Sequence, residues 1–132
     1  MKLVIYGRPT TKKNSSRVVT VGRTHKIPKV LPSKAYCEYE KEALLQLLPY
    51  RKRRLSGTVK VSCKYYMPDK RSSPDLVGLL QATSDVLEKA NIIDNDKYIT
   101  SYDGSCIVGI DRQSPRVEIE IEPSQSDYWK GR

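Results

Sequence analysis

The stretch that decides the fold runs from Arg71 to Asp96 and reads RSSPDLVGLLQATSDVLEKANIIDND. Ser73 can cap a helix, and Pro74 suits the first helical position because a proline there loses no backbone hydrogen bond. Apolar or small residues then recur at the spacing of one helix face. They are Leu76, Leu79, Leu80, Thr83, Val86, Leu87 and Ala90. We therefore expect a helix that packs on a core and runs into an acidic loop.

Three aspartates surround this helix. Asp75 would lie in its first turn, where the helix dipole favours the ionised carboxylate by about 0.3–1 kcal/mol. Gly78 and Ala82 on the same side would leave room above Asp75 for a bulky ligand. Asp94 and Asp96, two residues apart, would project the same way from an extended loop. Mg²⁺ takes one or two carboxylates together with water and phosphate oxygens. We predict Asp75, Asp94 and Asp96 as metal ligands, with Asp75 and Asp96 as catalytic residues.

The length of the helix sets a geometric condition on this site. From Asp75 to Asn91 an intact helix would be about 24 Å long, so the acidic loop begins far from Asp75. Either the helix ends early and residues 92–96 return along its flank, or Asp96 meets the Asp75 of a second subunit. Each aspartate also has a purely structural alternative, since helix starts and loops commonly use this residue type.

Periodicity outlines the rest of the fold. A second helix would begin after Ser33 as its N-cap and end at Pro49. The expected strands are Leu3–Tyr6, Val59–Tyr65, Tyr98–Tyr102, Ser105–Ile110 and Val117–Glu122. Asp103-Gly104 should join two of them as a two-residue hairpin turn. Residues 7–32 should form a basic arm or loose hairpin, and residues 123–132 a loose tail. The fold class is α/β, of the α+β type: one mixed sheet of about five strands with two main helices packed on it.

Charge is distributed unevenly along the 132 residues, which we expect to form a single domain over residues 1–132. Residues 1–70 hold 17 lysines and arginines against 4 acids, whereas residues 71–132 hold 7 against 11, for a net charge of +9. The basic half suits a phosphate backbone, and Lys60 and Lys64 would give the strand at 59–65 a basic face as well. The residues predicted to contact DNA are Arg8, Lys12, Lys13, Arg17, Arg51, Lys52, Arg53, Arg54 and Arg71.

The cysteines and the hydropathy exclude several classes of protein. Cys37, Cys63 and Cys106 lie far apart without a CxxC pair, which supports neither a disulfide framework nor a zinc site. No run approaches 18 apolar residues, so we expect no membrane association and a cytoplasmic location.

Several short motifs, in order, resemble the RusA-type Holliday junction resolvases. They are Tyr6-Gly7-Arg8-Pro9, Lys12-Lys13-Asn14, Pro74-Asp75-Leu76, Asp85-Val86-Leu87, Asn95-Asp96 and Pro115-Arg116-Val117-Glu118-Ile119. The resemblance spans roughly residues 3–122. It implies a small homodimeric α/β endonuclease that cuts four-way DNA junctions symmetrically with Mg²⁺, acting in DNA recombination and repair.

The chain departs from that family's pattern at two positions. The family's helix start reads about P-D-L-D-N-L-x-K, whereas this chain has Val77 in place of the second aspartate and Gln81 in place of the lysine. One carboxylate is lost, together with a cation that stabilises charge developing in the reaction. We hypothesise that Asp94 replaces the carboxylate and that Lys12 or Lys13 replaces the cation.

Three functions follow from these observations. The leading hypothesis is a Mg²⁺-dependent, structure-selective endodeoxyribonuclease that resolves four-way junctions. The first alternative is a DNA-binding module of the same fold with impaired catalysis, which the losses at Val77 and Gln81 permit. The second is a basic RNA- or protein-binding domain whose aspartates are only helix caps and turn residues. Mg²⁺-dependent junction cleavage distinguishes the first hypothesis from the other two.

Overall fold

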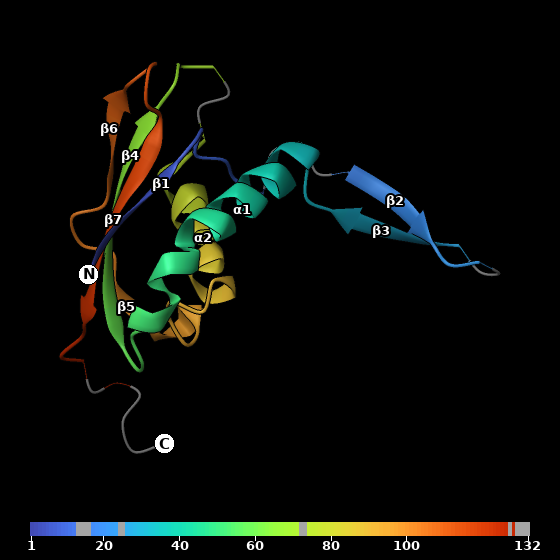
Figure 1. Cartoon of the computed structure of the whole chain (residues 1–132). Coiled ribbons are helices and arrows are strands. Elements are labelled where there is room, and N and C mark those ends of the chain that lie inside the picture. Colours follow the sequence, from blue (N-terminus) through green and yellow to red (C-terminus); the bar gives the residue numbers. More distant parts are fainter. Residues whose placement is uncertain (13–16, 24–25, 72–73, 127, 129–132) are drawn as a thin grey trace.

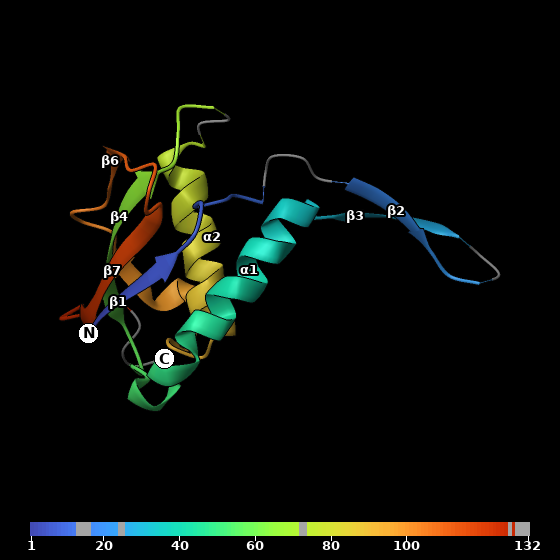
Figure 2. The same ribbon diagram turned by 45° about the horizontal axis from the view of Figure 1, so that its top comes forward.

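The computed structural model describes residues 1–12, 17–23, 26–71, 74–126 and 128. Two helices cover one face of a mixed sheet, and a separate hairpin projects from the body beyond the start of α1 (Figures 1 and 2). In chain order the elements are β1 (Lys2–Tyr6), β2 (Arg17–Val21), β3 (Ile27–Leu31), α1 (Lys34–Leu47), the 3-10 helix η1 (Leu48–Arg53), β4 (Val59–Met67), α2 (Leu76–Lys89), the 3-10 helix η2 (Asp96–Tyr98), β5 (Ile99–Ser101), β6 (Cys106–Ile110) and β7 (Arg116–Pro123).

The main sheet has the strand order β1-β7-β4-β5, and β6 also pairs with β4. β7 lies antiparallel between β1 and β4, whereas β5 and β6 both run parallel to β4. Parallel neighbours need a crossover connection, and α2 carries the chain from β4 to β5. The prediction of a mixed sheet of five strands with two main helices is confirmed.

The predicted hairpin between β5 and β6 is wrong. β5 pairs with β4 at Val59 and Lys60, and β6 pairs with it in the same direction along Lys64–Met67. The Asp103-Gly104 turn therefore takes the chain out of the strand and returns it without reversing its direction. Within this excursion, Ser105 Oγ accepts a hydrogen bond from the Cys63 N–H at 3.0 Å, which provides that β4 donor with a partner.

Alternating burial along β4 and β7 places the core between the sheet and the helices. The buried apolar side chains include Leu3, Ile5, Val59, Val61, Val117, Ile119, Ile121, Ala43, Leu47, Leu79, Val86 and Leu87. Two hydroxyl pairs fix the rotation of α2 on this core. Tyr65 Oη lies 2.7 Å from Thr83 Oγ1, and Tyr102 Oη lies 2.7 Å from Ser84 Oγ. Val77 consequently faces outward and is 69% exposed.

The two helix starts compare differently with their predictions. Ser33 caps α1 as expected, because its Oγ accepts the Tyr36 N–H at 3.1 Å. At α2 the N-cap is Asp75, with an extended backbone at φ −77° and ψ 153°, and the first helical residue is Leu76. The predicted cap, Ser73, lies outside the described residues. Asp75 therefore occupies the N-cap position and does not lie within the first turn. Aspartate is among the preferred residue types at an N-cap.

The segments predicted to be loose contain regular structure. Within the arm, β2 and β3 pair antiparallel from Arg17 opposite Leu31 to Val21 opposite Ile27, which is the hairpin alternative. The prediction of a loose tail is wrong for residues 123–126. There the Ser124 N–H donates to a backbone carbonyl at 2.9 Å, and its Oγ lies 2.7 Å from Thr100 Oγ1. The rest of the predicted tail, except residue 128, lies outside the described residues.

The face of the sheet that the helices leave open carries balanced charge. Lys60 of β4 lies opposite Glu122 of β7, and Lys64 lies opposite Glu118. At the other side of β7, Lys2 Nζ lies 3.3 Å from an oxygen of Glu120. The predicted basic face of β4 is therefore offset by the neighbouring strand. None of the helices in the described part of the chain is long and apolar enough to cross a bilayer.

Candidate active site

Asp75 lies against Gly78 at the N-terminal end of α2. A Cβ atom built on Gly78 would lie 2.6 Å from Asp75 Oδ1 and 3.3 Å from Thr11 Cγ2. The space beside Gly78 is thus occupied by the Asp75 carboxylate and by Thr11. The room expected above that carboxylate for a bulky ligand stays a prediction. Asp75 itself is exposed.

Asp94 lies at the other end of α2, where it joins two loops. Its Oδ2 accepts the Gly57 N–H at 2.9 Å, and its Oδ1 is paired with the Arg54 guanidinium. The Gly57 N–H and the Arg54 charge together hold the pKa of the Asp94 carboxyl below its ordinary value. Both carboxylate oxygens therefore have partners that stabilise the loop before β4. The assignment of Asp94 as a metal ligand stays a prediction.

Asp96 begins η2 at the same end of the helix. Its backbone N–H donates to Glu88 Oε1 at 2.8 Å, from the last turn of α2, and its side chain is half-buried. Asn95 precedes it as the cap of η2, with its Oδ1 accepting the Lys97 N–H at 3.0 Å. Glu88 was not predicted as a site residue. Its position in the helical pattern is that of an ordinary acidic residue facing solvent. Its contact with Asp96 depends on the path of the loop after α2, which the sequence pattern does not give.

Asp75 and Asp96 are not brought together within one chain. The 14 residues of α2 make it about 21 Å long, with one aspartate at each end. The loop after α2 turns back only to the last turn of the helix, where the Asp96 N–H donates to Glu88 Oε1, and does not run on along the flank to Asp75. Instead Ile93 bridges to Leu55, whose N–H donates to the carbonyl of Ile92 at 2.9 Å. Among the described residues, no group of three or more histidine, cysteine or acidic side chains could hold a metal ion.

A lysine from the arm lies beside the middle of α2. Lys12 Nζ lies 2.9 Å from Asp85 Oδ2, and Gln81 Nε2 donates to Asp85 Oδ1 at 3.3 Å. The same ammonium lies 5.5 Å from the centre of the Tyr36 ring. Burial, followed by the charge of Glu40, raises the pKa of Tyr36, so its ring stays neutral under Lys12. Lys12 and Gln81 therefore share Asp85 as a partner, and the role of Lys12 as the replacement cation stays a prediction; Lys13 lies outside the described residues.

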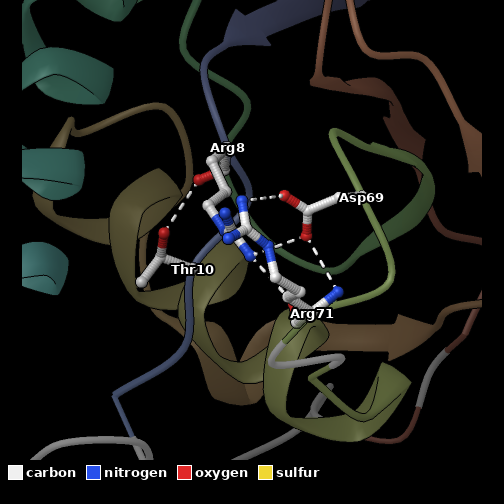
Figure 3. Close-up of polar contacts among 4 residues, drawn as sticks. All are labelled: Arg8, Thr10, Asp69 and Arg71. Atoms are coloured by element: carbon white, nitrogen blue, oxygen red, sulfur yellow. Dashed lines mark hydrogen bonds and ion pairs between the residues drawn. The ribbon is translucent and has the colours of Figure 1, made fainter.

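The other predicted DNA-contacting residues form groups at both ends of α2. Arg8 and Arg71 meet near its start, where both contact Asp69 (Figure 3). The exposed run from Arg51 to Arg54 lies near its end, joined to the acidic loop by the pair of Arg54 with Asp94. Arg17 lies in β2 of the arm. Each end of α2 thus combines an aspartate with basic residues from a distant part of the sequence.

A family model described as endodeoxyribonuclease RusA matches residues 7–122. This match covers both ends of α2, the arm, and β4, β5, β6 and all but the last residue of β7 in the main sheet; β1 lies outside it. The chain belongs to the RusA family. Membership makes it, in general terms, a Holliday junction-resolving endodeoxyribonuclease, and RusA-family nucleases bind branched DNA and generally depend on a divalent metal. No curated protein matches the chain.

Proposed function

We propose that this RusA-family chain cuts four-way DNA junctions as a Mg²⁺-dependent homodimer whose metal sites are each shared between two copies. The observation that carries the proposal is the position of Asp75 and Asp96 at opposite ends of α2, about 21 Å apart. One chain therefore offers two half-sites. A two-fold axis that crosses the middle of α2 would bring Asp75 of each copy toward Asp96 of the other, because such interfaces pair unlike residues reciprocally.

The outward face of α2 suits such a contact. Val77 is 69% exposed on a helix whose other apolar residues are buried or half-buried. Gln81 and Glu88 lie on the same face, four and eleven residues further along. An antiparallel partner helix would cover Val77 at each end and place Glu88 of one copy near Asp75 of the other. The open face of the sheet, with its balanced charge, stays outside this contact.

The donor set fits a hard divalent cation only when two copies are combined. Asp75 and Asp96 supply carboxylate oxygens, the ligand type that Mg²⁺ prefers. Within one chain, however, the two residues lie at opposite ends of α2. When bound, the ion supplies Lewis-acid stabilisation of phosphate charge and a water of lowered pKa. The protein's own part is to fix the two carboxylates. Gly78 and Thr11 support Asp75, and Glu88 holds the Asp96 backbone.

Basic residues would position the DNA around each shared site. Arg8 and Arg71 lie at the Asp75 end, and the run from Arg51 to Arg54 lies at the Asp96 end. In the proposed dimer both groups border the same site. Lys12 would add a cation over α2, where it is held by Asp85. Such a positive border grips phosphates without reading bases, which suits a nuclease that recognises the shape of a junction in recombination and repair.

Complementation between two inactive variants tests the shared site. Asp75→Asn and Asp96→Asn are each expected to abolish Mg²⁺-dependent cleavage of a labelled four-way junction. When the two variants are unfolded together and refolded, about half of the dimers are mixed, and each mixed dimer holds one intact pair of carboxylates. The mixture should therefore nick the junction once, whereas a site within one chain would stay inactive. Mixing Asp75→Asn with the Asp75→Asn/Asp96→Asn double variant is the matched control and should restore nothing.

A second candidate function is junction binding without catalysis. It is favoured by Val77, an exposed apolar residue at a position where the family carries an aspartate. Asp94, the hypothesised replacement for that aspartate, is already engaged by Arg54 and Gly57. This candidate predicts that the unmodified protein shifts a four-way junction in a gel but leaves it uncut in Mg²⁺. Cleavage that stops on addition of EDTA excludes it.

A further inference from the structure

Asp69 joins two loops that come from distant parts of the sequence. Its Oδ1 accepts a hydrogen bond from Arg8 Nη2 at 3.2 Å and from the Arg71 N–H at 2.9 Å. Its Oδ2 lies 3.4 Å from Arg71 Nη2. Arg8 Nη2 also donates to the carbonyl of Arg71 at 2.8 Å. Figure 3 shows both guanidinium groups turned toward the one carboxylate. The end of β1 is thereby fastened to the loop between β4 and α2.

The charges of this cluster leave a surplus of one positive unit. The Asp69 side chain is only 14% exposed, whereas those of Arg8 and Arg71 are 43% and 86% exposed. Burial alone would raise the pKa of Asp69, but the Arg71 N–H and the two guanidinium charges outweigh it and lower that pKa. Both guanidinium groups make these contacts through Nη2, and both side chains are exposed enough to reach a further partner. Guanidinium groups of this kind bind phosphate in a planar, two-point manner.

The cluster also borders the half-site at Asp75. Arg71 precedes Asp75 by four residues, and Arg8 precedes by three the Thr11 whose methyl group lies against Gly78. The Thr10 hydroxyl donates to the Arg8 carbonyl at 2.8 Å, which holds the arm where it leaves β1 (Figure 3). A DNA strand that reaches Asp75 would therefore pass both arginines.

We propose that Asp69 is a positioning residue that holds Arg8 and Arg71 together as a binding site for one phosphate group of the DNA strand beside Asp75. The inference rests on the proposed function and adds to it a residue that no motif of the chain singled out. Without Asp69, the two guanidinium groups would repel each other at close range. The exposed side chain of Arg71 would then rotate freely and would no longer be held in one orientation. With Asp69, both are presented in one orientation before the DNA arrives, which reduces the ordering cost of binding.

The sign of one substitution separates positioning from simple neutralisation. Asp69→Asn removes a negative charge next to the DNA but keeps a side-chain oxygen that can accept the Arg71 N–H. If Asp69 merely neutralised the arginines, the substitution would tighten junction binding. If Asp69 positions them, the substitution weakens binding although the protein becomes more positive.

The experiment measures the affinity for a labelled four-way junction in EDTA, by gel shift, at several salt concentrations. We expect Asp69→Asn, Arg8→Gln and Arg71→Gln each to weaken binding about fivefold or more. Each arginine variant should also reduce the salt slope by about one. The Arg8→Gln/Arg71→Gln/Asp69→Asn triple variant should bind no more weakly than Arg8→Gln/Arg71→Gln, because Asp69 acts only through the two arginines. Asp103→Asn, an exposed acid in the β5–β6 excursion, is the matched control for a lost negative charge.

Equal or tighter binding by Asp69→Asn, relative to Asp103→Asn, overturns the inference. A melting curve checks that Asp69→Asn is folded. If it is not, Arg8→Gln and Arg71→Gln provide the test, because unchanged binding and an unchanged salt slope in both arginine variants would also overturn the inference. Failure of the proposed function has a different signature. In that case the unmodified protein itself would leave the four-way junction uncut in Mg²⁺, whatever its affinity for the junction in EDTA.

Discussion

At the scale of single residues, the contact of Asp75 with Gly78 connects the start of α2 to its chemistry. The glycine is buried and helical, and its missing side chain is what lets Asp75 Oδ1 lie over the first turn, next to Thr11. A carboxylate at a helix N-terminus is stabilised in its charged form by the backbone N–H groups there. Gly78 thus sets where a carboxylate oxygen lies at the start of α2, and a fixed position is what a metal ligand needs.

Gly78→Ala should therefore separate stability from activity. Alanine favours a helix over glycine by about 1 kcal/mol, and the displaced atom is the movable end of a side chain, so the melting temperature should stay the same or rise slightly. The added Cβ would displace the Asp75 carboxylate from its place 2.6 Å away, and misplacement on this scale costs about a hundredfold in rate. Junction cleavage and thermal unfolding measure the two effects. Combining Gly78→Ala with Asp75→Asn should produce no additional loss of cleavage; an additional loss would mean that Gly78 acts through another group.

At the scale of elements, local patterns predicted what each segment is but not which segment it meets. The helical spacing around Leu79 and the alternation along β4 depend on neighbours in the sequence, so α2 and the five strands could be predicted. The Asp103-Gly104 signal is equally local and correctly indicates a turn. Whether that turn reverses the chain depends on the edge of β4, which pairs with both flanking segments in parallel. The same limit explains why the contacts of Glu88 and Asp69 were missed.

The arm formed by β2 and β3 allows a prediction about one element. Its two strands pair with each other in a sheet of their own and project from the body (Figures 1 and 2). The segment between Arg17 and Leu31 carries four basic residues and no acid. Replacing it by a short glycine-serine linker should change the melting temperature little, while weakening junction binding and reducing its salt slope by up to about four. A gel shift at increasing salt measures this. An unchanged slope would show that the arm does not touch the DNA.

At the scale of the whole molecule, ion pairs make the fold sensitive to acid. The pKa values of Asp69, Asp94 and Asp111 are all lowered in the folded chain. For Asp111 the main cause is the hydrogen bond from Arg116, whose guanidinium also lies 3.8 Å from the centre of the Tyr66 ring. A carboxyl with a lowered folded-state pKa stabilises the fold above its unfolded-state pKa. That contribution is lost as the pH falls through the folded-state value.

The free energy of unfolding should therefore change little from pH 7 to about pH 5 and fall below about pH 4. Urea unfolding across this range measures it. The Asp111→Asn variant should be less stable than the parent at pH 7 and should lose less on acidification, because one of the three groups no longer titrates. A parent protein whose stability rose between pH 5 and pH 3 would contradict this account.

The excursion between β5 and β6 has a consequence for how chains with this architecture can vary in length. Because residues 102–105 leave the edge of β4 and rejoin it in the same direction, both flanking segments keep their register whatever the size of the detour. The Ser105 hydroxyl and the close approach of Gly104 to Ser62 tie it to the sheet, and the Tyr102 hydroxyl ties its first residue to Ser84 of α2. Insertions next to Asp103 would therefore extend the molecule at the edge of the sheet and leave the pairing of β5 and β6 with β4 unchanged.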